Sequence, residues 1–432
     1  MARPLRHSER TFVFAAADMV AATVAVVLSV WTWSLTAGFP FTPHSVLTHW
    51  PWLLAAPLWV VALAPTRWPG AVFDLKAVQR GIAQACSLLL AGYLVVFFFA
   101  GPDTLPRLVA LYFLWDAAWL TWAIRLFLLW TFTRQAFTRR MFIVGTGPVA
   151  EAARVLLAST KLADIELVDA PALATDVVVA MSGPVPQETL DGLLAYQEQG
   201  VDVVTFAHLY EQTMRRVPVR HVGHDWMLTQ LFAGSVGREA SPLAKRLLDV
   251  AAGLVLSALG LVPALIAALA VLLETGRPVL YSQTRLGRGG VPFRLTKFRT
   301  MHHDAEATGP QWSQKDDPRI TRVGRILRRT HMDELPNVWA VLRGDMSMVG
   351  PRPERPEFVS LLERQLPLYR ARLTVAPGLT GWAQVKTGYG DSVEDATNKL
   401  EYDLYYVRHQ SLLFDLNILV RTVGRTLGWK GR

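Results

Sequence analysis

The feature that most constrains the fold is a series of four apolar segments in the first third of the chain. They cover residues 11–35, 49–64, 81–100 and 108–132. A helix needs about 20 apolar residues to cross a bilayer core that is about 30 Å thick. The second segment is short, but the others are long enough to cross. With 51% hydrophobic residues in the whole chain, the pattern predicts a membrane protein whose residues 1–138 form a four-helix transmembrane bundle.

Basic residues in the loops predict the orientation of these spans. Residues 37–48 contain no Lys or Arg, whereas residues 65–80 contain three, and further arginines follow the fourth segment. Cytoplasmic loops are enriched in Lys and Arg, so we expect both ends of the chain in the cytoplasm. Asp18 and Asp116 fall inside spans, where a polar pathway is conceivable and partners inside the bundle are favoured.

The net charge of +9 fits anionic lipids and anionic substrates on the cytoplasmic side. No basic aromatic nucleic-acid motif is visible in the sequence, so we expect no nucleic-acid partner. The single cysteine, Cys86, excludes an intrachain disulfide and a zinc site built from several cysteines.

Residues 139–240 alternate strand and helix patterns, which is typical of a parallel sheet. Strand-like runs begin near residues 141, 165, 177 and 203, and a helical pattern covers 187–199. We therefore expect a small Rossmann-like domain. Its first strand leads into Gly145-Thr146-Gly147-Pro148-Val149-Ala150. Such a turn can seat a phosphate at a helix N-terminus, but Ala150 replaces the third glycine of that motif, and a docking or regulatory role is favoured.

Residues 250–273 form an uncharged run that is long enough to cross a bilayer. Gly260 and Pro263 lie near its middle, where proline removes a helical hydrogen bond and bends the axis. Both flanks are basic, and a true span would place one of them outside. We therefore favour a bent, re-entrant helix over about 246–274, with Ser257 satisfying backbone groups freed at the bend. An ordinary fifth span is the alternative.

Three short motifs between residues 297 and 353 concentrate cations, acids and tight turns. They read Lys297-Phe298-Arg299-Thr300-Met301, Asp333-Glu334-Leu335-Pro336-Asn337 and Gly350-Pro351-Arg352-Pro353. An adjacent Asp–Glu pair is by itself typical of a solvated surface. Among these cations it indicates an enzyme that holds a diphosphate, because the charge must be neutralised while a carboxylate approaches phosphorus.

Three more motifs complete a recognisable order. They read Lys245-Arg246-Leu247-Leu248-Asp249, Gln283-Thr284-Arg285-Leu286-Gly287 and Pro377-Gly378-Leu379-Thr380-Gly381-Trp382-Ala383-Gln384-Val385. From Lys245 to Arg432 the chain resembles the bacterial sugar transferases, which are monotopic phosphoglycosyl transferases. The preceding spans and α/β domain resemble the large-form subgroup of that family. The expected fold is thus membrane α plus α/β, with a C-terminal monotopic α/β catalytic domain at 241–432.

The resemblance implies transfer of a sugar 1-phosphate from a UDP-sugar to polyprenyl (undecaprenyl) phosphate, with UMP as the second product. It also implies Mg²⁺ as a cofactor, a phosphosugar attached to the aspartate as an intermediate, and a homodimer. The expected location is the cytoplasmic face of the bacterial inner membrane, where such enzymes start the assembly of exopolysaccharide, O-antigen or capsule. The sugar itself is not encoded in any motif we can interpret.

The chemistry of the two acids fits separate roles. On a helix, neighbouring side chains diverge by about 100°, so Asp333 and Glu334 should not share a proton. We expect Asp333 to act as nucleophile and metal ligand, and Glu334 to act as base or to orient the incoming phosphate. Pro336 is tolerated in the first turn of a helix, which places Asp333 near a helix N-terminus that would favour its ionised form.

Four cations and one amide are the candidates for substrate binding. Lys297 and Arg299 are two apart, so on a strand both would face the same way. Arg352 lies between two prolines, which restricts its backbone, and Arg328 precedes Asp333 by five residues. A contact with a lipid headgroup or a surface ion pair is the alternative for each cation. Gln384 is expected near the nucleotide, whereas Trp382 could pack either there or in the core.

Basic and apolar residues also alternate from residue 355 onward and over residues 402–425. Helices of this kind often lie in the membrane interface, although ordinary amphipathic packing explains the pattern equally well. Two rival functions are an oxidoreductase or dehydratase that uses the glycine turn at 145–150, and a non-catalytic membrane scaffold for glycan assembly. The first explains neither the bent helix nor the acid–cation set, and the intact set argues against the second.

Overall fold

The computed structural model describes residues 7–38, 40–42, 54–63, 75–99, 107–132, 139–159, 165–222, 226, 229–230, 241–303, 305, 317–366, 368–388 and 392–426. The chain divides into two compact units, Met1–Thr213 and Met214–Arg432. Each unit is considered by itself below. The three-domain division at 138/139 and 240/241 stays a prediction.

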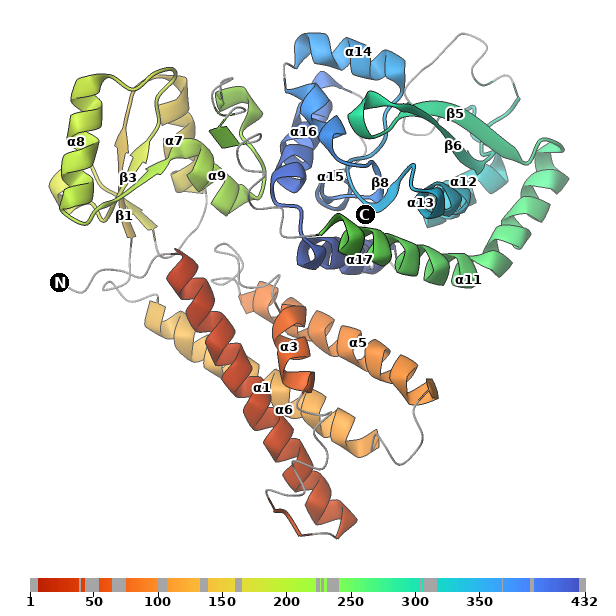
Figure 1. Cartoon of the computed structure of the whole chain (residues 1–432), viewed down its shortest axis with the longest axis horizontal. Coiled ribbons are helices and arrows are strands. Elements are labelled where there is room, and N and C mark those ends of the chain that lie inside the picture. The colour runs from red at the N-terminus through yellow and green to blue at the C-terminus, as the bar shows by residue number, and fades with distance from the viewer. Residues whose placement is uncertain are drawn as a thin grey trace. The chain divides into compact units, whose positions relative to one another are not determined.

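Four helices open the first unit: α1 (His7–Ala37), α3 (Ala55–Leu63), α5 (Leu75–Phe99) and α6 (Arg107–Phe132) (Figure 1). They fall within or overlap the four apolar segments of the sequence. Buried small and aromatic side chains form their shared core, among them Ala22, Ala25, Trp59, Val109 and Phe113. The alanines let the helices approach closely, and Trp59 packs edge-on against Phe113.

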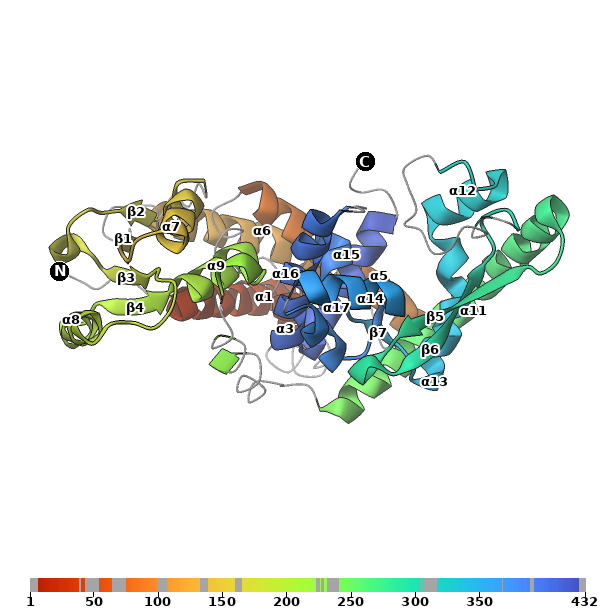
Figure 2. The same cartoon turned by 90° about the horizontal axis from the view of Figure 1, so that it is seen from above.

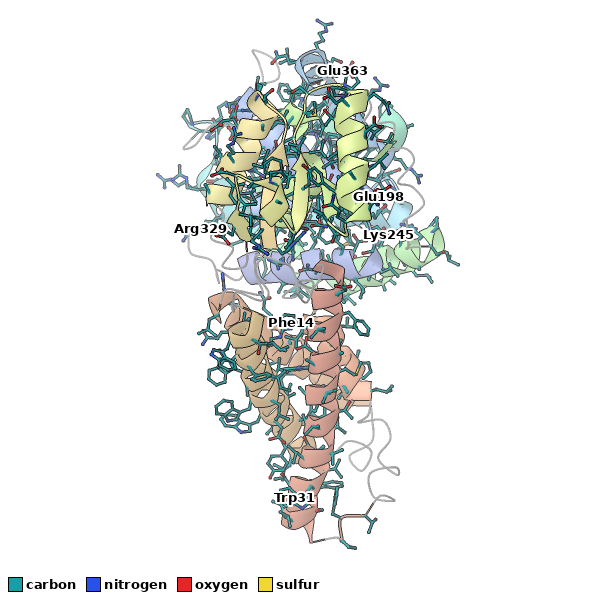
Figure 3. All side chains as sticks on the ribbon, turned by 90° about the vertical axis from the view of Figure 1, so that its left-hand side faces the viewer. Phe14, Trp31, Glu198, Lys245, Arg329 and Glu363 are labelled. Atoms are coloured by element: carbon teal, nitrogen blue, oxygen red, sulfur yellow. The ribbon has the colours of Figure 1, made fainter. Side chains whose placement is uncertain are left out.

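Large apolar side chains also stand on the outer faces of these helices. Trp31 on α1 is exposed (Figure 3). On α6 the exposed residues are Trp115, Trp119 and Trp130, as expected for helices whose surroundings are apolar. Among the described residues, three stretches are helical, long and apolar enough to cross a membrane: Phe12–Ala37, Leu108–Thr131 and Pro242–Thr275. The prediction of long apolar helices is thus confirmed, while the arrangement of four spans remains a prediction.

The acids inside the spans have partners within the helical core, as predicted. Both carboxylate oxygens of Asp18 accept hydrogen bonds from Arg125, at 3.0 and 2.7 Å. Each of these side chains is only 1% exposed. Asp116 accepts a longer hydrogen bond of 3.4 Å from the Ser29 hydroxyl. These contacts hold α1 to α6 and neutralise charges that an apolar environment would strongly disfavour.

The rest of the first unit is a parallel sheet flanked by helices. Its elements are β1 (Arg139–Val144), α7 (Pro148–Ser159), β2 (Ile165–Leu167), η4 (Pro171–Leu173), β3 (Asp176–Val179), α8 (Gln187–Glu198), β4 (Asp202–Thr205) and α9 (Phe206–Met214). The strand order is β2-β1-β3-β4 and every pairing is parallel. The predicted α/β pattern is therefore confirmed, with strand ends displaced by one or two residues.

The glycine turn after β1 has a steric explanation. Gly145 has a φ of +133°, and a Cβ atom there would collide with the backbone of Ala180 next to β3. Only glycine fits where the two chain segments approach so closely. The first glycine of the turn is thus required by the packing of the sheet, independently of any nucleotide.

The second unit contains the remaining helices and two small sheets. After η5 (Val219–His221) come α11 (Pro242–Thr275), β5 (Leu280–Leu286), η8 (Arg288–Gly290), β6 (Pro292–Phe298), α12 (Arg322–Thr330), η9 (Met332–Asn337), α13 (Val338–Arg343), β7 (Ser347–Val349), α14 (Pro356–Gln365), η10 (Tyr369–Thr374), β8 (Gly378–Thr380), α15 (Trp382–Lys386), α16 (Val393–Arg408) and α17 (Leu412–Thr426). Strands β5 and β6 form an antiparallel hairpin, and β7 pairs with β8 in parallel. The hairpin overlaps α11 when seen from above (Figure 2), but Figure 1 shows that the two meet only at the C-terminal end of α11.

Helix α11 is continuous but bent, with Pro263 inside it; Figure 1 shows it changing direction in its second half. Proline has no N–H, so the carbonyl of Leu259 loses its helical donor. The Ser257 hydroxyl donates to the carbonyl of Gly253 at 2.8 Å, one turn before the bend. Ser257 therefore does not satisfy the group that the proline frees, which corrects the sequence-based expectation.

One side of α11 packs on protein and the other is exposed and apolar. A Cβ atom on Gly260 would lie 3.2 Å from the side chain of Leu335, so the missing side chain makes room for η9. Ala267 and Val271 join a core cluster, whereas Leu259 is 73% and Leu273 is 79% exposed. This asymmetry suits a helix with one face in lipid. Whether α11 re-enters or crosses the membrane remains a prediction.

The N-terminal end of α11 is fixed by buried charges. Lys245 forms ion pairs with Asp249 and, at 2.8 Å, with Asp415 of α17. Asp249 also accepts hydrogen bonds of 2.9 Å from the Ser347 hydroxyl and from the backbone N–H of Met348. The start of the apolar helix is thus attached to β7, the strand that leads into the Gly350-Pro351-Arg352 segment.

Candidate active site

The acid pair follows a left-handed turn. Helix α12 begins after Thr321, whose hydroxyl accepts from the N–H of Gly324. It ends at His331, which has a φ of 58° and redirects the chain. Asp333 and Glu334 then occupy the first turn of η9, a short 3₁₀ helix that contains Pro336 and leads directly into α13. Asp333 is therefore near the start of a helix, as predicted, and this helix is a short 3₁₀ helix.

Glu334 lies at the centre of an ion cluster assembled from three elements. Its Oε1 accepts from Lys297 Nζ at 2.6 Å and from Arg352 Nη2 at 2.7 Å. Lys297 comes from β6, and Arg352 comes from the segment after β7. The structure thus brings together three of the residues that the sequence singled out. We use "acid–cation cluster" below for Lys297, Asp333, Glu334 and Arg352.

Burial and the charges of neighbouring groups shift the pKa values of Glu334 and Lys297. Burial alone would raise the pKa of Glu334, but Arg352 and Lys297 outweigh it and hold that pKa well below its ordinary value. Burial lowers the pKa of Lys297, and the nearby Glu334 carboxylate opposes that shift. Glu334 is consequently a stable anion that orients two cations, which matches the orienting role and leaves it poorly suited to hold a proton at neutral pH.

Asp333 has a different environment from its neighbour. Its carboxylate takes no part in the hydrogen bonds or ion pairs of the described residues, although the residue is only 8% exposed. Burial raises the pKa of Asp333, and Lys297, Arg352 and Arg328 oppose that rise. Burial has the largest influence on this pKa, and the effect of the helix N-terminus stays a prediction. Both oxygens are nevertheless available to a ligand or to an electrophile.

Arg328 lies near the cluster without joining its ion pairs. It is on the last turn of α12, and its Nε donates to the Thr300 hydroxyl at 2.9 Å. Its charge is close enough to lower the pKa of Asp333. Arg328 therefore adds to the positive potential that Asp333 experiences, and Thr300 fixes its orientation.

Arg299 departs from the prediction that it pairs with Lys297. Strand β6 ends at Phe298, and the Nη2 of Arg299 donates to the carbonyls of Thr275 and Gly276 at 3.0 and 2.6 Å. It also donates to the Thr275 hydroxyl at 2.8 Å. Arg299 thus satisfies carbonyls at the C-terminal end of α11, where a cation also complements the helix dipole. These contacts hold the C-terminal end of α11 against the end of β6.

The structure decides between the two predicted surroundings of Trp382, whereas the placement of Gln384 near a nucleotide stays a prediction. The side-chain amide of Gln384 donates to the carbonyl of Leu379 at 3.2 Å. Trp382 is buried, donates its indole N–H to the carbonyl of Arg215 at 2.9 Å, and packs edge-on against Phe414. The core alternative therefore holds for Trp382. The same hydrogen bond shows that the chain near residue 215 packs with the C-terminal helices.

The sequence did not indicate the residues that support Arg352. The backbone carbonyl of Arg352 accepts from Nη2 of Arg372 at 2.9 Å, and the same nitrogen pairs with Asp403 at 2.8 Å. Arg372 and Tyr369 belong to the pattern of basic and apolar residues that begins at residue 355, for which a membrane interface and ordinary packing were both open. Both residues are buried in protein, so ordinary packing explains this part of the pattern.

The donor set bears on the expected Mg²⁺. Among the described residues, no group of three or more His, Cys, Asp or Glu side chains could hold a metal ion by itself. Mg²⁺ characteristically binds one or two carboxylates together with substrate phosphates and water. Asp333, with both oxygens available, fits that pattern, whereas Glu334 already binds two cations. Asp333 is thus the carboxylate that the described part of the site offers to Mg²⁺, and a diphosphate would supply further ligands.

The arrangement combines an available carboxylate with oriented positive charge. Lys297 and Arg352 lie against Glu334 and close to Asp333, so a doubly or triply charged anion next to Asp333 would be stabilised by both. The Arg352 side chain is 37% exposed, which leaves it accessible from solvent. A carboxylate nucleophile that meets a phosphate ester requires this combination of charges.

Comparison with known proteins places these residues in a family. The family model described as "Bacterial sugar transferase" matches residues 240–428. The chain is 45% identical over 199 residues to the UDP-glucose:undecaprenyl-phosphate glucose-1-phosphate transferase of Caulobacter vibrioides, which covers 46% of this chain and 74% of that protein. It is 41% identical over 165 residues to an exopolysaccharide production protein of Rhizobium leguminosarum, covering 37% of this chain and 82% of that protein.

A third relative is named for a sugar other than glucose. The chain is 38% identical over 225 residues to the UDP-N-acetylgalactosamine-undecaprenyl-phosphate N-acetylgalactosaminephosphotransferase of Aeromonas hydrophila. That match covers 52% of each chain, so the similarity spans about half of this relative. The relatives are named for different sugars, while the motifs and the acid–cation cluster lie within the matched region. The chain belongs to the bacterial sugar transferase family.

Proposed function

We propose that the protein transfers a sugar 1-phosphate from a UDP-sugar to undecaprenyl phosphate, forming undecaprenyl-diphosphosugar and UMP. The observation that carries the proposal is the available carboxylate of Asp333 beside Lys297 and Arg352, both fixed by Glu334. The names of the Caulobacter and Aeromonas relatives describe the same reaction type. Because those names differ in the sugar, the sugar is left open.

In the first step, an oxygen of Asp333 attacks the phosphorus that bears the sugar. The bond between this phosphorus and the bridging oxygen breaks, and UMP leaves with the electron pair. Lys297 and Arg352 stabilise the charge that accumulates on the phosphoryl oxygens, and Arg328 adds to the positive potential. A Mg²⁺ ion bound by Asp333 and the diphosphate would neutralise further charge on the donor.

In the second step, a phosphate oxygen of undecaprenyl phosphate attacks the same phosphorus. The acyl-phosphate bond breaks, and Asp333 regains its carboxylate. Glu334 keeps Lys297 and Arg352 oriented through both steps. Since its pKa is held low, we propose that Glu334 orients the acceptor phosphate and its cations and does not act as a proton store.

The long apolar helices, α11 among them, support a location of the reaction at a membrane. We propose that the protein lies in the bacterial inner membrane, with α11 re-entrant, the acid–cation cluster on the cytoplasmic face and two chains forming a homodimer. There the product would start exopolysaccharide, O-antigen or capsule assembly. The rival role for the glycine turn lacks a supporting observation, because Gly145 is explained by its packing against Ala180.

An assay of UMP release tests the reaction. Purified full-length protein in nanodiscs is mixed with Mg²⁺, undecaprenyl phosphate and each member of a panel of UDP-sugars. We expect stoichiometric formation of UMP and of the lipid-linked diphosphosugar with at least one donor. UMP without lipid product, or lipid product without UMP, would overturn the proposed reaction.

Cysteine labelling tests the orientation. Single cysteines at Lys245 and Arg288 in a Cys86→Ala background are treated in intact cells with an impermeant thiol reagent. We expect neither position to react until the cells are permeabilised. Labelling at 288 but not at 245 would establish that α11 crosses the membrane and defeat the re-entrant model.

A further inference from the structure

The segment that carries Arg352 is held on one side by backbone hydrogen bonds. The N–H of Gly350 donates to the carbonyl of Thr380, and the N–H of Gly378 donates to the carbonyl of Pro351, both at 2.9 Å. A Cβ atom on either glycine would collide with the other backbone segment. These contacts fix residues 350 and 351 against β8 but leave the carbonyl of Arg352 to another partner.

That partner is Arg372, which lies deep in the second unit. Its side chain is 6% exposed, and its Nη2 contacts both the Arg352 carbonyl and the carboxylate of Asp403, whose side chain is 2% exposed. Its Nη1 donates to the hydroxyl of Tyr369 at 2.7 Å. A guanidinium has a rigid planar fork, so these three contacts together define where the Arg352 carbonyl lies.

Stability alone does not account for this arrangement. Replacing a buried ion pair by well-packed apolar residues is often neutral or stabilising, because desolvation of the charges offsets their attraction. Among the described residues, Nε of Arg372 is buried without a hydrogen-bond partner, which adds a further penalty. What the buried Arg372 provides despite these penalties is its hydrogen bond to the backbone carbonyl of Arg352, a residue of the acid–cation cluster.

The chain of contacts runs from α16 to Glu334. Asp403 on α16 fixes Arg372, Arg372 fixes the Arg352 carbonyl, and the Arg352 guanidinium binds Glu334 at 2.7 Å. The backbone carbonyl of Arg352 is thus fixed by Arg372, while the guanidinium of Arg352 binds Glu334. Displacement of a catalytic group by about 1 Å can reduce a rate by about 100-fold.

We propose that Arg372, held by Asp403 and Tyr369, is a positioning residue that sets the location of Arg352 and, through it, of Glu334. The proposal rests on the proposed transferase function, since it assigns Arg372 a role in that reaction. Arg372 touches neither substrate nor reacting atoms. It acts only through the carbonyl of Arg352. The losses in kcat/KM caused by changing Arg372 and Arg352 should therefore not be additive in free energy, which can be tested.

A double-mutant cycle on the full-length protein in nanodiscs tests it. Arg372→Met should lower kcat/KM for the UDP-sugar by about 10- to 100-fold. In an Arg352→Ala background the same substitution should produce less than a threefold further loss, because the group that Arg372 positions is already absent. Tyr369→Phe removes one hydroxyl and keeps the ring, so it provides a milder probe if Arg372→Met fails to fold; it should show the same non-additivity.

Two controls separate positioning from a general effect on the fold. Arg216→Met breaks another ion pair to α16, the one with Glu401, without reaching Arg352, and should leave kcat/KM within about twofold. Arg372→Lys keeps the charge beside Asp403 but lacks the planar fork, and should recover only part of the loss. Losses that multiply in the double variant, or an equal loss from Arg216→Met, would overturn the proposal.

The proposed function and this inference fail in different ways. Absence of UMP from the unmodified protein with every UDP-sugar would refute the function, whatever the variants do. An active unmodified protein whose Arg372→Met and Tyr369→Phe variants retain full kcat/KM would refute only the positioning role.

Discussion

Two sets of buried charges in this molecule look alike in composition and differ in what surrounds them. In the helical part, Asp18 and Arg125 form a bidentate pair, each 1% exposed, and the pair is neutral. In the acid–cation cluster, Lys297 and Arg352 share one oxygen of Glu334 and remain 16% and 37% exposed. Asp333 lies beside them with its carboxylate available. The first set is closed to ligands, whereas the second is open to an anion.

The difference shows which features of a buried ion pair indicate function. A structural pair uses all its strong donors and acceptors internally, because any unpaired charge would be penalised. The acid–cation cluster instead keeps an unpartnered carboxylate next to cations that still have accessible surface. The following predictions test whether the two sets differ in this way.

The largest effect is expected for Asp333→Asn. The amide is a poor nucleophile, so the burst of UMP from donor alone and the full turnover should both fall by at least about 10³-fold. Rapid-quench measurement of UMP and intact-mass analysis of donor-treated protein check this, since the unmodified protein should gain the mass of a phosphosugar. Asp345→Asn, a change at an exposed acid, is the matched control. UMP release that needs the lipid acceptor, with no trapped adduct, would argue for direct displacement.

Removal of divalent metal should have the next largest effect. With EDTA in excess, we expect UMP formation to fall by on the order of 100-fold, because charge on the diphosphate is no longer neutralised. Added Mg²⁺ should restore the rate, and EDTA saturated with Mg²⁺ beforehand should have no effect. An unchanged rate in the chelated, metal-analysed sample would remove Mg²⁺ from the proposal.

Glu334→Gln should separate the two half-reactions. The amide keeps the shape of the side chain but no longer attracts Lys297 and Arg352 as an anion, so we expect turnover to fall by about 10- to 100-fold. The donor-only burst should form more slowly but reach an amplitude near that of the unmodified protein, because Glu334 only orients the cations in the first step. Loss of burst amplitude in a folded Glu334→Gln protein would show that the first step cannot proceed without this carboxylate.

The smallest effect on chemistry is expected for Asp18→Asn. The change leaves Arg125 buried without its anion, which typically destabilises by about 3–5 kcal/mol. The midpoint of thermal unfolding should fall clearly, while kcat of the remaining folded protein stays within about twofold. The double variant Asp18→Leu/Arg125→Leu should regain most of the lost stability. A specific loss of kcat without loss of stability would contradict the contrast between the two sets.

Much of the architecture could be predicted from local patterns. The apolar segments became α1, α3, α5 and α6, and the alternating runs after residue 139 became a parallel sheet. Both patterns depend on the period of side-chain placement along a single element, which the sequence shows directly. The bend of α11 was similarly visible from Pro263, because the effect of proline is local.

The partners of the cations could not be predicted in the same way. Motifs identified Lys297, Glu334 and Arg352, but their shared oxygen depends on how β6, η9 and the segment after β7 come together. Arg299 shows the limit most clearly: strand periodicity placed it with Lys297, yet its long side chain reaches the end of α11. For Arg372 both alternatives stayed open, because an amphipathic pattern does not show whether its face meets lipid or protein.

The absence of a side chain at Gly260 has a consequence for the acceptor. Leu335 rests directly on α11 at this point, and Leu335 is the next residue after Glu334. If α11 lies in lipid as proposed, only the side chain of Leu335 separates the hydrocarbon region of the membrane from the turn that carries Asp333 and Glu334. A polyprenyl phosphate of any chain length could then react while its isoprenoid tail stays in the hydrocarbon region. Only its phosphate head group would need to approach the protein. Chain length should accordingly matter little, and the depth of the head group a great deal.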